Sequence, residues 1–160
     1  MRAPQLGIAL LTALALAACG SGSDDSATPA SAGPSGTVNV AETELGEILV
    51  GADGLTLYLF TADRNGQSSC IGACAETWPP ITVDGRATAG DGVDEGKLDT
   101  APRGDSTLQV TYNGHPLYRY SGDEEPGDTK GHAVDDAWFA VTPEGDAAEG
   151  KKVGGYGGGY

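Results

Sequence analysis

The chain has few basic residues, two histidines and three cysteines among its 160 residues. Lysine and arginine total 9 against 23 aspartates and glutamates, which gives a net charge of −14. This imbalance argues against a nucleic-acid partner and against binding to anionic lipid by charge. It favours a solvated acidic surface or cationic partners such as metal ions and basic proteins.

Sequence signatures of common catalytic sites are also missing. No serine lies in a G-x-S-x-G context, so a Ser-His-Asp hydrolase would have no recognisable nucleophile. Neighbouring carboxylates occur at Asp123-Glu124-Glu125 and at Asp135-Asp136. In so acidic a chain this proximity carries no signal for acid–base catalysis. The sequence therefore favours a protein that is not an enzyme.

Only the N-terminus carries a long apolar run. It covers residues 7–18 and is too short to span a bilayer comfortably, since a spanning helix needs about 20 apolar residues. It follows Met1-Arg2 and ends in L-A-A-C at Cys19, which resembles the lipobox of bacterial lipoproteins. Residues 1–18 are thus predicted to be a lipoprotein signal peptide, with Cys19 as the lipidated residue. The alternative is an ordinary cleavage site that has a cysteine nearby by chance.

Lipidation at Cys19 would anchor the mature chain to a bacterial membrane on its extracytoplasmic side. Two or three acyl chains, palmitate among them, anchor stably where a single chain binds only marginally. Loss of residues 1–18 removes Arg2, which leaves 8 basic and 23 acidic residues, or a charge of −15. The membrane partner is therefore reached through lipid and not through protein charge.

Composition predicts a single folded domain between two flexible ends. Residues 19–40 hold almost no large apolar side chain and are predicted to be a disordered tether after the lipidated cysteine. Residues 146–160 end in a glycine- and tyrosine-rich stretch that is also predicted to be disordered. The domain is expected over residues 41–145, a typical single-domain size.

The domain sequence repeats itself at an offset of 60 residues. This offset places Val50 on Val110 and Trp78 on Trp138, and residues 54–63 on residues 114–123. Repeat one is expected over about residues 45–83 and repeat two over about residues 105–143. Two copies of one unit indicate that neither copy completes its core alone.

Each repeat is predicted to form a hairpin and a third strand, which gives a small all-β domain built as a sandwich or a partly closed barrel. Asp53-Gly54 and Asn113-Gly114 each separate two apolar runs and favour a type I′ turn. The strand around residues 57–60 is apolar on both faces and should be central, whereas Arg119 should face water. A short helical turn is expected over residues 71–77.

Both repeats contain the pattern Tyr-x-(Phe/Trp/Tyr)-x-x-Asp, and each is followed by a tryptophan. This pattern resembles the signature of a family of predicted bacterial lipoproteins, known as a secreted repeat of unknown function. The resemblance covers about residues 45–143 and implies a location and a repeat architecture. It implies no reaction, substrate or catalytic residue. The residues that carry it are Tyr58, Phe60, Asp63, Trp78, Tyr118, Tyr120, Asp123 and Trp138.

The two motifs admit a structural and a functional interpretation. The two aromatic residues lie on one face of a strand, and the aspartate follows where the strand should end. In the favoured interpretation the aromatics form the core, and the aspartate accepts hydrogen bonds from the backbone of its own loop. The alternative is an aromatic groove with an acidic rim that would suit sugars or cations.

Cys70 and Cys74 are present in the first repeat only, and an exported protein usually oxidises such a pair to a disulfide. The rival interpretation is a dithiol that binds copper or exchanges electrons, with His115 or His132 assisting. The leading function is therefore a lipid-anchored, non-enzymatic binding or structural module without a cofactor or metal, whose protein, glycan or cation ligand is unknown. The alternative is a redox or copper-handling envelope protein.

Overall fold

The computed structural model describes residues 36–150 of the chain. All of them belong to the second of two units, which spans Ala32–Tyr160. The predicted signal peptide, the lipidation site Cys19, most of the predicted tether and the chain beyond Gly150 lie outside the described residues.

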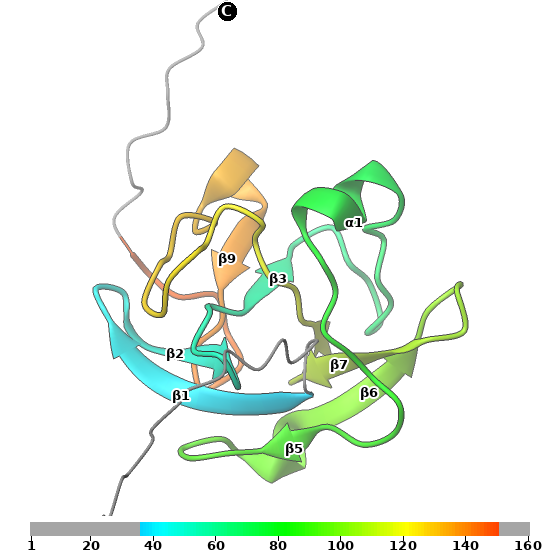
Figure 1. The fold of residues 1–160 in the computed structure, drawn as a ribbon, viewed down its shortest axis with the longest axis horizontal. Coiled ribbons are helices and arrows are strands. Elements are labelled where there is room, and N and C mark those ends of the chain that lie inside the picture. Colours follow the sequence, from blue (N-terminus) through cyan, green and yellow to red (C-terminus); the bar gives the residue numbers. More distant parts are fainter. Residues whose placement is uncertain (1–35, 151–160) are drawn as a thin grey trace, which may run out of the picture. The chain divides into compact units, whose positions relative to one another are not determined.

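Short strands dominate the described residues (Figure 1). They form several sheets, none of which closes into a barrel, and this confirms a small all-β domain. The expected helical turn near the cysteine pair is also present. In chain order the elements are β1 (Thr37–Thr43), β2 (Gly46–Gly51), β3 (Tyr58–Phe60), α1 (Ala73–Thr77), β4 (Thr82–Val83), β5 (Thr88–Ala89), η1 (Glu95–Lys97), β6 (Leu98–Pro102), β7 (Leu108–Tyr112), β8 (His115–Pro116), η2 (Val134–Asp136) and β9 (Trp138–Ala140).

Each copy of the repeat opens with an antiparallel hairpin, β1–β2 in the first and β6–β7 in the second. Both connections have a residue with positive φ at the same repeat position: Gly46, which begins β2, at 85°, and Ser106, in the loop before β7, at 69°. The repeats therefore begin earlier than residues 45 and 105. β1 starts inside the segment predicted as a tether because Val38, fully buried, packs into the core.

The turn after the second strand of the hairpin differs between the copies. Asn113 and Gly114 both have positive φ, 49° and 79°, which gives the predicted type I′ turn between β7 and β8. In the first copy Gly54 has a φ of 79° but Asp53 does not have a positive φ, so the type I′ prediction is wrong there. An aspartate can instead stabilise a turn through its side chain, and Asp53 accepts a hydrogen bond from the N–H of Leu55 at 3.2 Å.

The turn at Asp53-Gly54 has one residue more than the turn at Asn113-Gly114, and this locally changes which residues of the two copies correspond. Leu49 donates its N–H to the carbonyl of Val141, and Val110 makes the equivalent bond to Ile81. The structural counterpart of Val110 is thus Leu49, at an offset of 61, and not Val50. The β6–β7 register is shifted by one residue relative to the β1–β2 register, which restores the offset of 60 on the other side.

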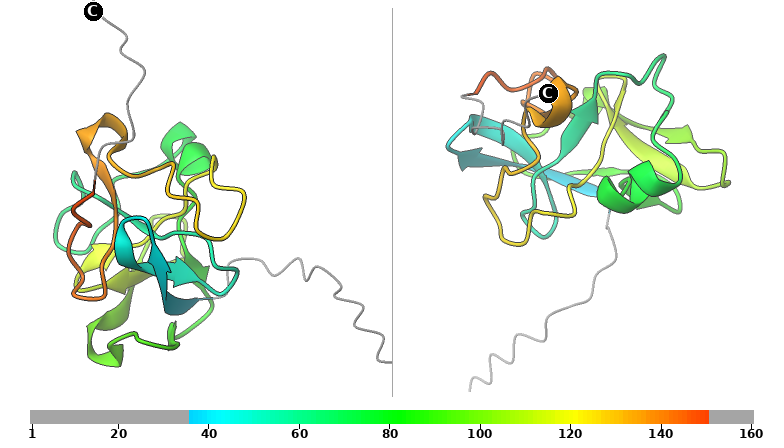
Figure 2. Two further views of the ribbon diagram at one scale, coloured as in Figure 1. Left: turned by 90° about the vertical axis from the view of Figure 1, so that its left-hand side faces the viewer. Right: turned by 90° about the horizontal axis from the view of Figure 1, so that it is seen from above.

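The third strand of each copy pairs with the other copy. β3 of the first lies antiparallel to β9 of the second, and Tyr118 forms the equivalent bridge to Pro80. Between these pairs, Tyr58 and Tyr118 exchange both backbone hydrogen bonds at 2.9 Å. The strand around Tyr58 is therefore central, as predicted, and the view from above in Figure 2 shows β3 between the two hairpins.

Two apolar clusters form the core, and each draws side chains from both copies. This arrangement agrees with the prediction that neither copy completes its core alone. The first cluster contains Val38, Leu49, Leu57, Leu59, Ile81, Val110, Tyr112, Leu117 and Val141. The second contains Ile48, Val50, Tyr58, Cys70, Trp78, Tyr118, Trp138, Ala140 and Ala148.

Candidate functional site: the paired motifs and their surroundings

The tyrosine of each motif is hydrogen-bonded to the aspartate of the other motif. The hydroxyl of Tyr58 donates to Oδ2 of Asp123 at 2.6 Å. The hydroxyl of Tyr118 donates to Oδ2 of Asp63 at 2.7 Å. These two bonds join residues of different repeats, and they flank the point where the two tyrosine backbones pair. The motifs thus form a reciprocal brace between the copies.

The second oxygen of each carboxylate binds its own loop, as predicted. Oδ1 of Asp63 accepts the N–H of Ser69 at 2.7 Å, and Oδ1 of Asp123 accepts the N–H of Lys130 at 3.0 Å. Each aspartate therefore closes a turn and holds the opposite tyrosine at once. Sequence reasoning found the first role and missed the second, although the presence of a tyrosine and an aspartate in both copies was a usable signal.

Burial dominates the electrostatics of the brace. It raises the pKa of both Tyr58 and Tyr118, and the carboxylate facing each phenol adds to that rise. Burial also raises the pKa of Asp123 above its ordinary value, against the opposing effect of the hydrogen bond from Tyr58. The phenols consequently stay protonated and act as donors, since the charged form of each is disfavoured.

The remaining motif aromatics form a continuous stack of four rings through the second core cluster. Trp78 and Trp138 lie parallel at its centre, with centroids 3.9 Å apart and an interplanar angle of 1°. Phe60 stacks on Trp138 at 4.1 Å, and Tyr120 packs on Trp78 at 4.5 Å. Each tryptophan is thus covered by the motif aromatic of the other copy. The aromatic residues therefore fill the core, as the structural interpretation predicts.

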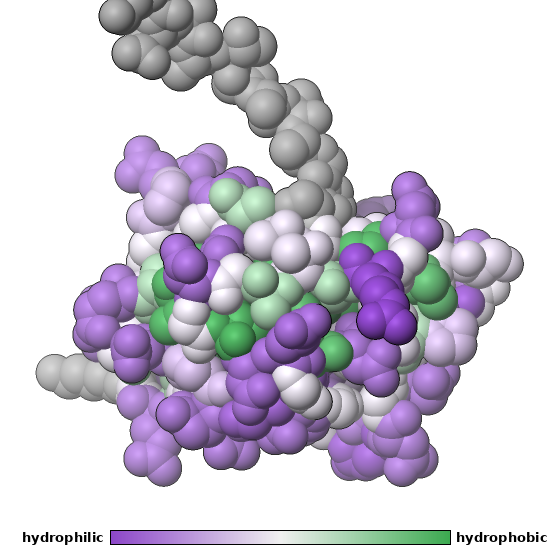
Figure 3. Space-filling view, turned by 90° about the horizontal axis from the view of Figure 1, so that it is seen from below, coloured by the Kyte–Doolittle hydropathy of each residue, from purple (hydrophilic) through white to green (hydrophobic). Residues whose placement is uncertain are grey.

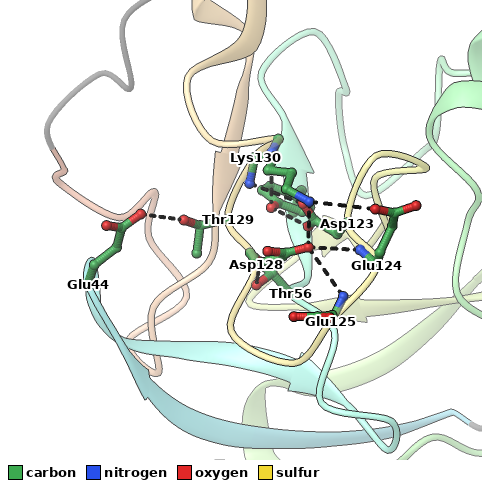
Figure 4. Close-up of polar contacts among 10 residues, drawn as sticks. Glu44, Thr56, Asp123, Glu124, Glu125, Asp128, Thr129 and Lys130 are labelled. Atoms are coloured by element: carbon green, nitrogen blue, oxygen red, sulfur yellow. Dashed lines mark hydrogen bonds and ion pairs between the residues drawn. The ribbon is translucent and has the colours of Figure 1, made fainter.

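The loop after Asp123 is held by its own charges and by the first copy (Figure 4). Oδ2 of Asp128 accepts the backbone N–H of Glu124 at 2.9 Å and Nζ of Lys130 at 2.8 Å. The hydrogen bond from Lys130, with further help from backbone donors, lowers the pKa of Asp128 to about 2. The hydroxyl of Thr56 donates to the carbonyl of Asp128 at 2.6 Å. These contacts keep the loop folded over Asp123.

A family model described as a secreted repeat of unknown function matches residues 39–82 and 99–142. The chain belongs to this family. Its description indicates an extracellular or cell-envelope location. No curated protein and no solved structure is significantly similar to the chain. Over residues 36–150, the structure has no helix with the length and apolar character needed to cross a membrane.

In this secreted repeat, Cys70 and Cys74 form the predicted disulfide, with Cα atoms 5.3 Å apart. The bridge pins a loop in which the carbonyl of Cys70 accepts Nη2 of Arg103 at 3.0 Å. Nη1 of Arg103 binds Ser68 and Gln109 at 2.9 and 2.6 Å. The disulfide loop of the first copy is therefore tied to the β6–β7 hairpin of the second. A cleft of about 480 Å³ lies between them, beside the exposed Ile71.

The two histidines of the secreted repeat lie in different settings. His115 begins β8 and is half-buried. His132 is only 5% exposed, and its Nδ1 accepts the N–H of Ala140 at 3.3 Å. Across residues 36–150, no three His, Cys, Asp or Glu side chains are grouped closely enough to hold a metal ion. The structure thus does not bring either histidine to the cysteine pair.

Proposed function

We propose that this secreted repeat is a lipoprotein anchored through Cys19 to the extracytoplasmic side of a bacterial membrane, and that its folded domain is a non-enzymatic binding or structural module. The reciprocal brace supports the second part most strongly. The tyrosine hydroxyls and aspartate carboxylates of the family motif are hydrogen-bonded to one another across the two copies. The motif therefore serves to join the repeats, and recognition falls to the surface around them.

The anchor is supported by the sequence ending in L-A-A-C at Cys19 and by membership of a secreted family. The test is the mass of the N-terminal peptide of protein isolated from its native envelope. We expect a chain that begins at Cys19 and carries a diacylglycerol and an acyl chain. A chain that begins elsewhere, or that carries an unmodified Cys19, would contradict the anchor. The matched variant Cys19→Ala has no thiol to carry the lipid, and it should no longer partition into the detergent phase.

The binding role is tested on the lipidated protein in detergent with a panel of glycans, peptides and cations. We expect saturable binding of at least one class, with the ligand recovered chemically unchanged. Recovery of an altered ligand would show an enzyme, and the absence of binding in every class would contradict the binding role.

A redox role is the second candidate, and the position of the disulfide favours it over copper binding. Cys70 is 1% exposed, whereas Cys74 in α1 is half-buried, so we expect an attacking thiolate to meet Cys74 first. Copper would require the reduced pair. Alkylation of protein isolated gently from the envelope distinguishes these states. Complete resistance to alkylation before reduction marks the bridge as structural, and a partly alkylated population supports the redox role.

A further inference from the structure

Comparison of the two copies shows that the outer edge of the first hairpin strand is covered in one copy. In the other copy no part of residues 36–150 covers it. In the first copy, β5 lies parallel to β1 on its outer side. Thr88 donates its N–H to the carbonyl of Gly36, Gly90 donates to Val38, and Val40 donates to Asp91 at 3.0 Å. An extended segment of four residues thus adds a strand to β1.

β6 is the counterpart of β1, and no strand within residues 36–150 covers its outer edge. Val110, opposite Thr100 in the β6–β7 register, donates its N–H to Ile81 and accepts the N–H of Leu117. The backbone groups of Thr100 must therefore point away from β7. The N–H of Thr100 bonds to Oδ1 of Asp99 at 2.8 Å, and its carbonyl accepts no hydrogen bond from residues 36–150. In the first copy, Val40 occupies the position equivalent to Thr100, and its N–H donates to the carbonyl of Asp91 in the added strand.

The segment of the second copy that corresponds to the strand added to β1 does not pair with β6. By the offset of 60, residues 148–151 correspond to residues 88–91. Ala148 instead donates its N–H to the carbonyl of Ala140, and Ala147 bridges Val141. The described part of this segment thus folds back beside β9 and leaves the β6 edge uncovered.

A cleft of about 320 Å³ lies along this edge. Its lining residues are Arg86, Ala87, Glu95, Leu98, Asp99 and Thr100. The exposed carboxylates of Glu95 and Asp99 outnumber the single guanidinium of Arg86 in this lining, and the whole chain carries a net charge of −14. Figure 3 views the molecule from below, the side on which β1, β5 and β6 lie in Figure 1, and shows polar side chains around smaller apolar patches. A cationic segment would meet attraction at this cleft, and an acidic one repulsion.

We propose that the outer edge of β6 binds an extended segment of another polypeptide, parallel to β6, that carries a lysine or arginine facing Glu95 and Asp99. A main-chain hydrogen bond to the open carbonyl of Thr100 supplies affinity, and so does one to the Thr100 N–H once the basic side chain draws Oδ1 of Asp99 away from it. The two carboxylates select the basic side chain. This rests on the proposed binding role and names the class of partner for it.

The probe for this site is a synthetic peptide that reproduces residues 86–93 with Asp91→Lys, because the native segment already covers the equivalent edge of β1. Its binding to the whole chain, purified in detergent, is followed by fluorescence anisotropy. Amide hydrogen exchange of residues 98–102 locates it. We expect saturable binding with slower exchange at Thr100, and about tenfold weaker binding of the same peptide with Asp at position 91.

Thr100→Pro is the blocking variant, since it removes the outward N–H and leaves the β6–β7 ladder intact. It should reduce affinity for the probe at least about tenfold. The charge variant Asp99→Lys should weaken binding in the same direction. Asp105→Lys is the matched control, because Asp105 is an exposed acid at the other cleft and should leave the affinity unchanged.

Several outcomes would overturn the proposal. Absence of probe binding, or equal binding by Thr100→Pro with an unchanged fold by circular dichroism, would do so. Binding that appears only after the chain is truncated at Gly150 would make its own C-terminus the occupant. Concentration-dependent dimers that Thr100→Pro abolishes would make a second copy the occupant. An unlipidated Cys19 would contradict the anchor and leave this site unaffected.

Discussion

At the scale of single residues, the phenol–carboxylate bonds are the most consequential polar contacts in the domain. Tyr58 and Tyr118 are fully buried, and Asp123 is 7% exposed. Removal of the Tyr58 hydroxyl therefore leaves Oδ2 of Asp123 without its donor in a buried environment. The cost of such a change exceeds that of an ordinary surface hydrogen bond, because desolvation of the carboxylate is no longer offset.

We expect Tyr58→Phe to lower the free energy of unfolding by about 1.5–3 kcal/mol, as for a hydrogen bond to a charged group. Tyr118→Phe should have a similar effect because it removes the equivalent bond to Asp63. The matched control is Tyr120→Phe, whose hydroxyl has no hydrogen-bond partner within residues 36–150. Urea unfolding measures all three. A cost for Tyr120→Phe equal to that for Tyr58→Phe would contradict the role of the brace.

Protonation of His132 should destabilise the fold. Burial lowers the pKa of His132 below its usual value. The unfolded chain then takes up this proton first, at about pH 6.5, so stability falls as the pH drops from there through the lowered folded-state pKa. The matched variant His132→Gln should show a flatter pH dependence between about pH 7.5 and about pH 5.5. Urea unfolding at these pH values tests this, and equal slopes for the two proteins would contradict it.

Some of these residue roles could be read from the sequence and others could not. The alternation rule placed Tyr58 and Tyr118 on a buried face, and turn chemistry placed Asp63 and Asp123 at loop starts. Which tyrosine met which aspartate depended on the pairing of the two copies, a long-range contact that local patterns do not encode. Arg119 was expected to face water, yet its side chain is only 15% exposed and forms an ion pair with Asp53.

At the scale of elements, the disulfide stabilises a loop that contributes to both copies. Cys70 and Cys74 close a ring around the start of α1, and Arg103 of the second copy reaches the carbonyl of Cys70. The sequence predicted this bridge from spacing and compartment. The partner hairpin could not be predicted, because an arginine in a loop gives no local signal of its destination.

Replacing both cysteines by serine should lower the free energy of unfolding by about 2 kcal/mol, the chain-entropy value for so small a ring. Chemical denaturation under oxidising conditions measures the change. The wild-type protein treated with a strong reductant should behave like the double variant. A reduced wild type as stable as the oxidised protein would contradict a structural role for the bridge.

The element boundaries show where pattern reasoning was weakest. The hairpin around Asn113-Gly114 followed from turn chemistry alone. β1 was missed because its residues are mostly small and polar, and only Val38 and Val40 hinted at a strand. The exchange of third strands between copies was likewise hidden, since β3 and β9 pair across about 80 residues of sequence.

At the scale of the whole domain, the two copies are interlocked and not placed side by side. Backbone pairing at Tyr58 and Tyr118, the exchanged hydrogen bonds and the stacked tryptophans all join residues of different copies. The duplicated sequence predicted this dependence in outline, because two incomplete units must share a core. Which strands and side chains of one copy pair with those of the other could be seen only in the structure.

Neither copy should fold alone. We expect a fragment of residues 36–97 and a fragment of residues 98–150 each to show no cooperative thermal transition by circular dichroism. An equimolar mixture should recover strand signal and a cooperative transition, because each fragment supplies the partners that the other lacks. A cooperative transition in either fragment by itself would show independent repeats.

The most direct test of the brace is a pair of double-mutant cycles on the free energy of unfolding. One cycle combines Tyr58→Phe with Asp123→Asn, and the other combines Tyr58→Phe with Asp63→Asn, the aspartate of the same motif. The account predicts a coupling energy of at least about 1 kcal/mol for Tyr58 with Asp123 and a value near zero for Tyr58 with Asp63. Coupling confined to the residues of one motif would contradict it.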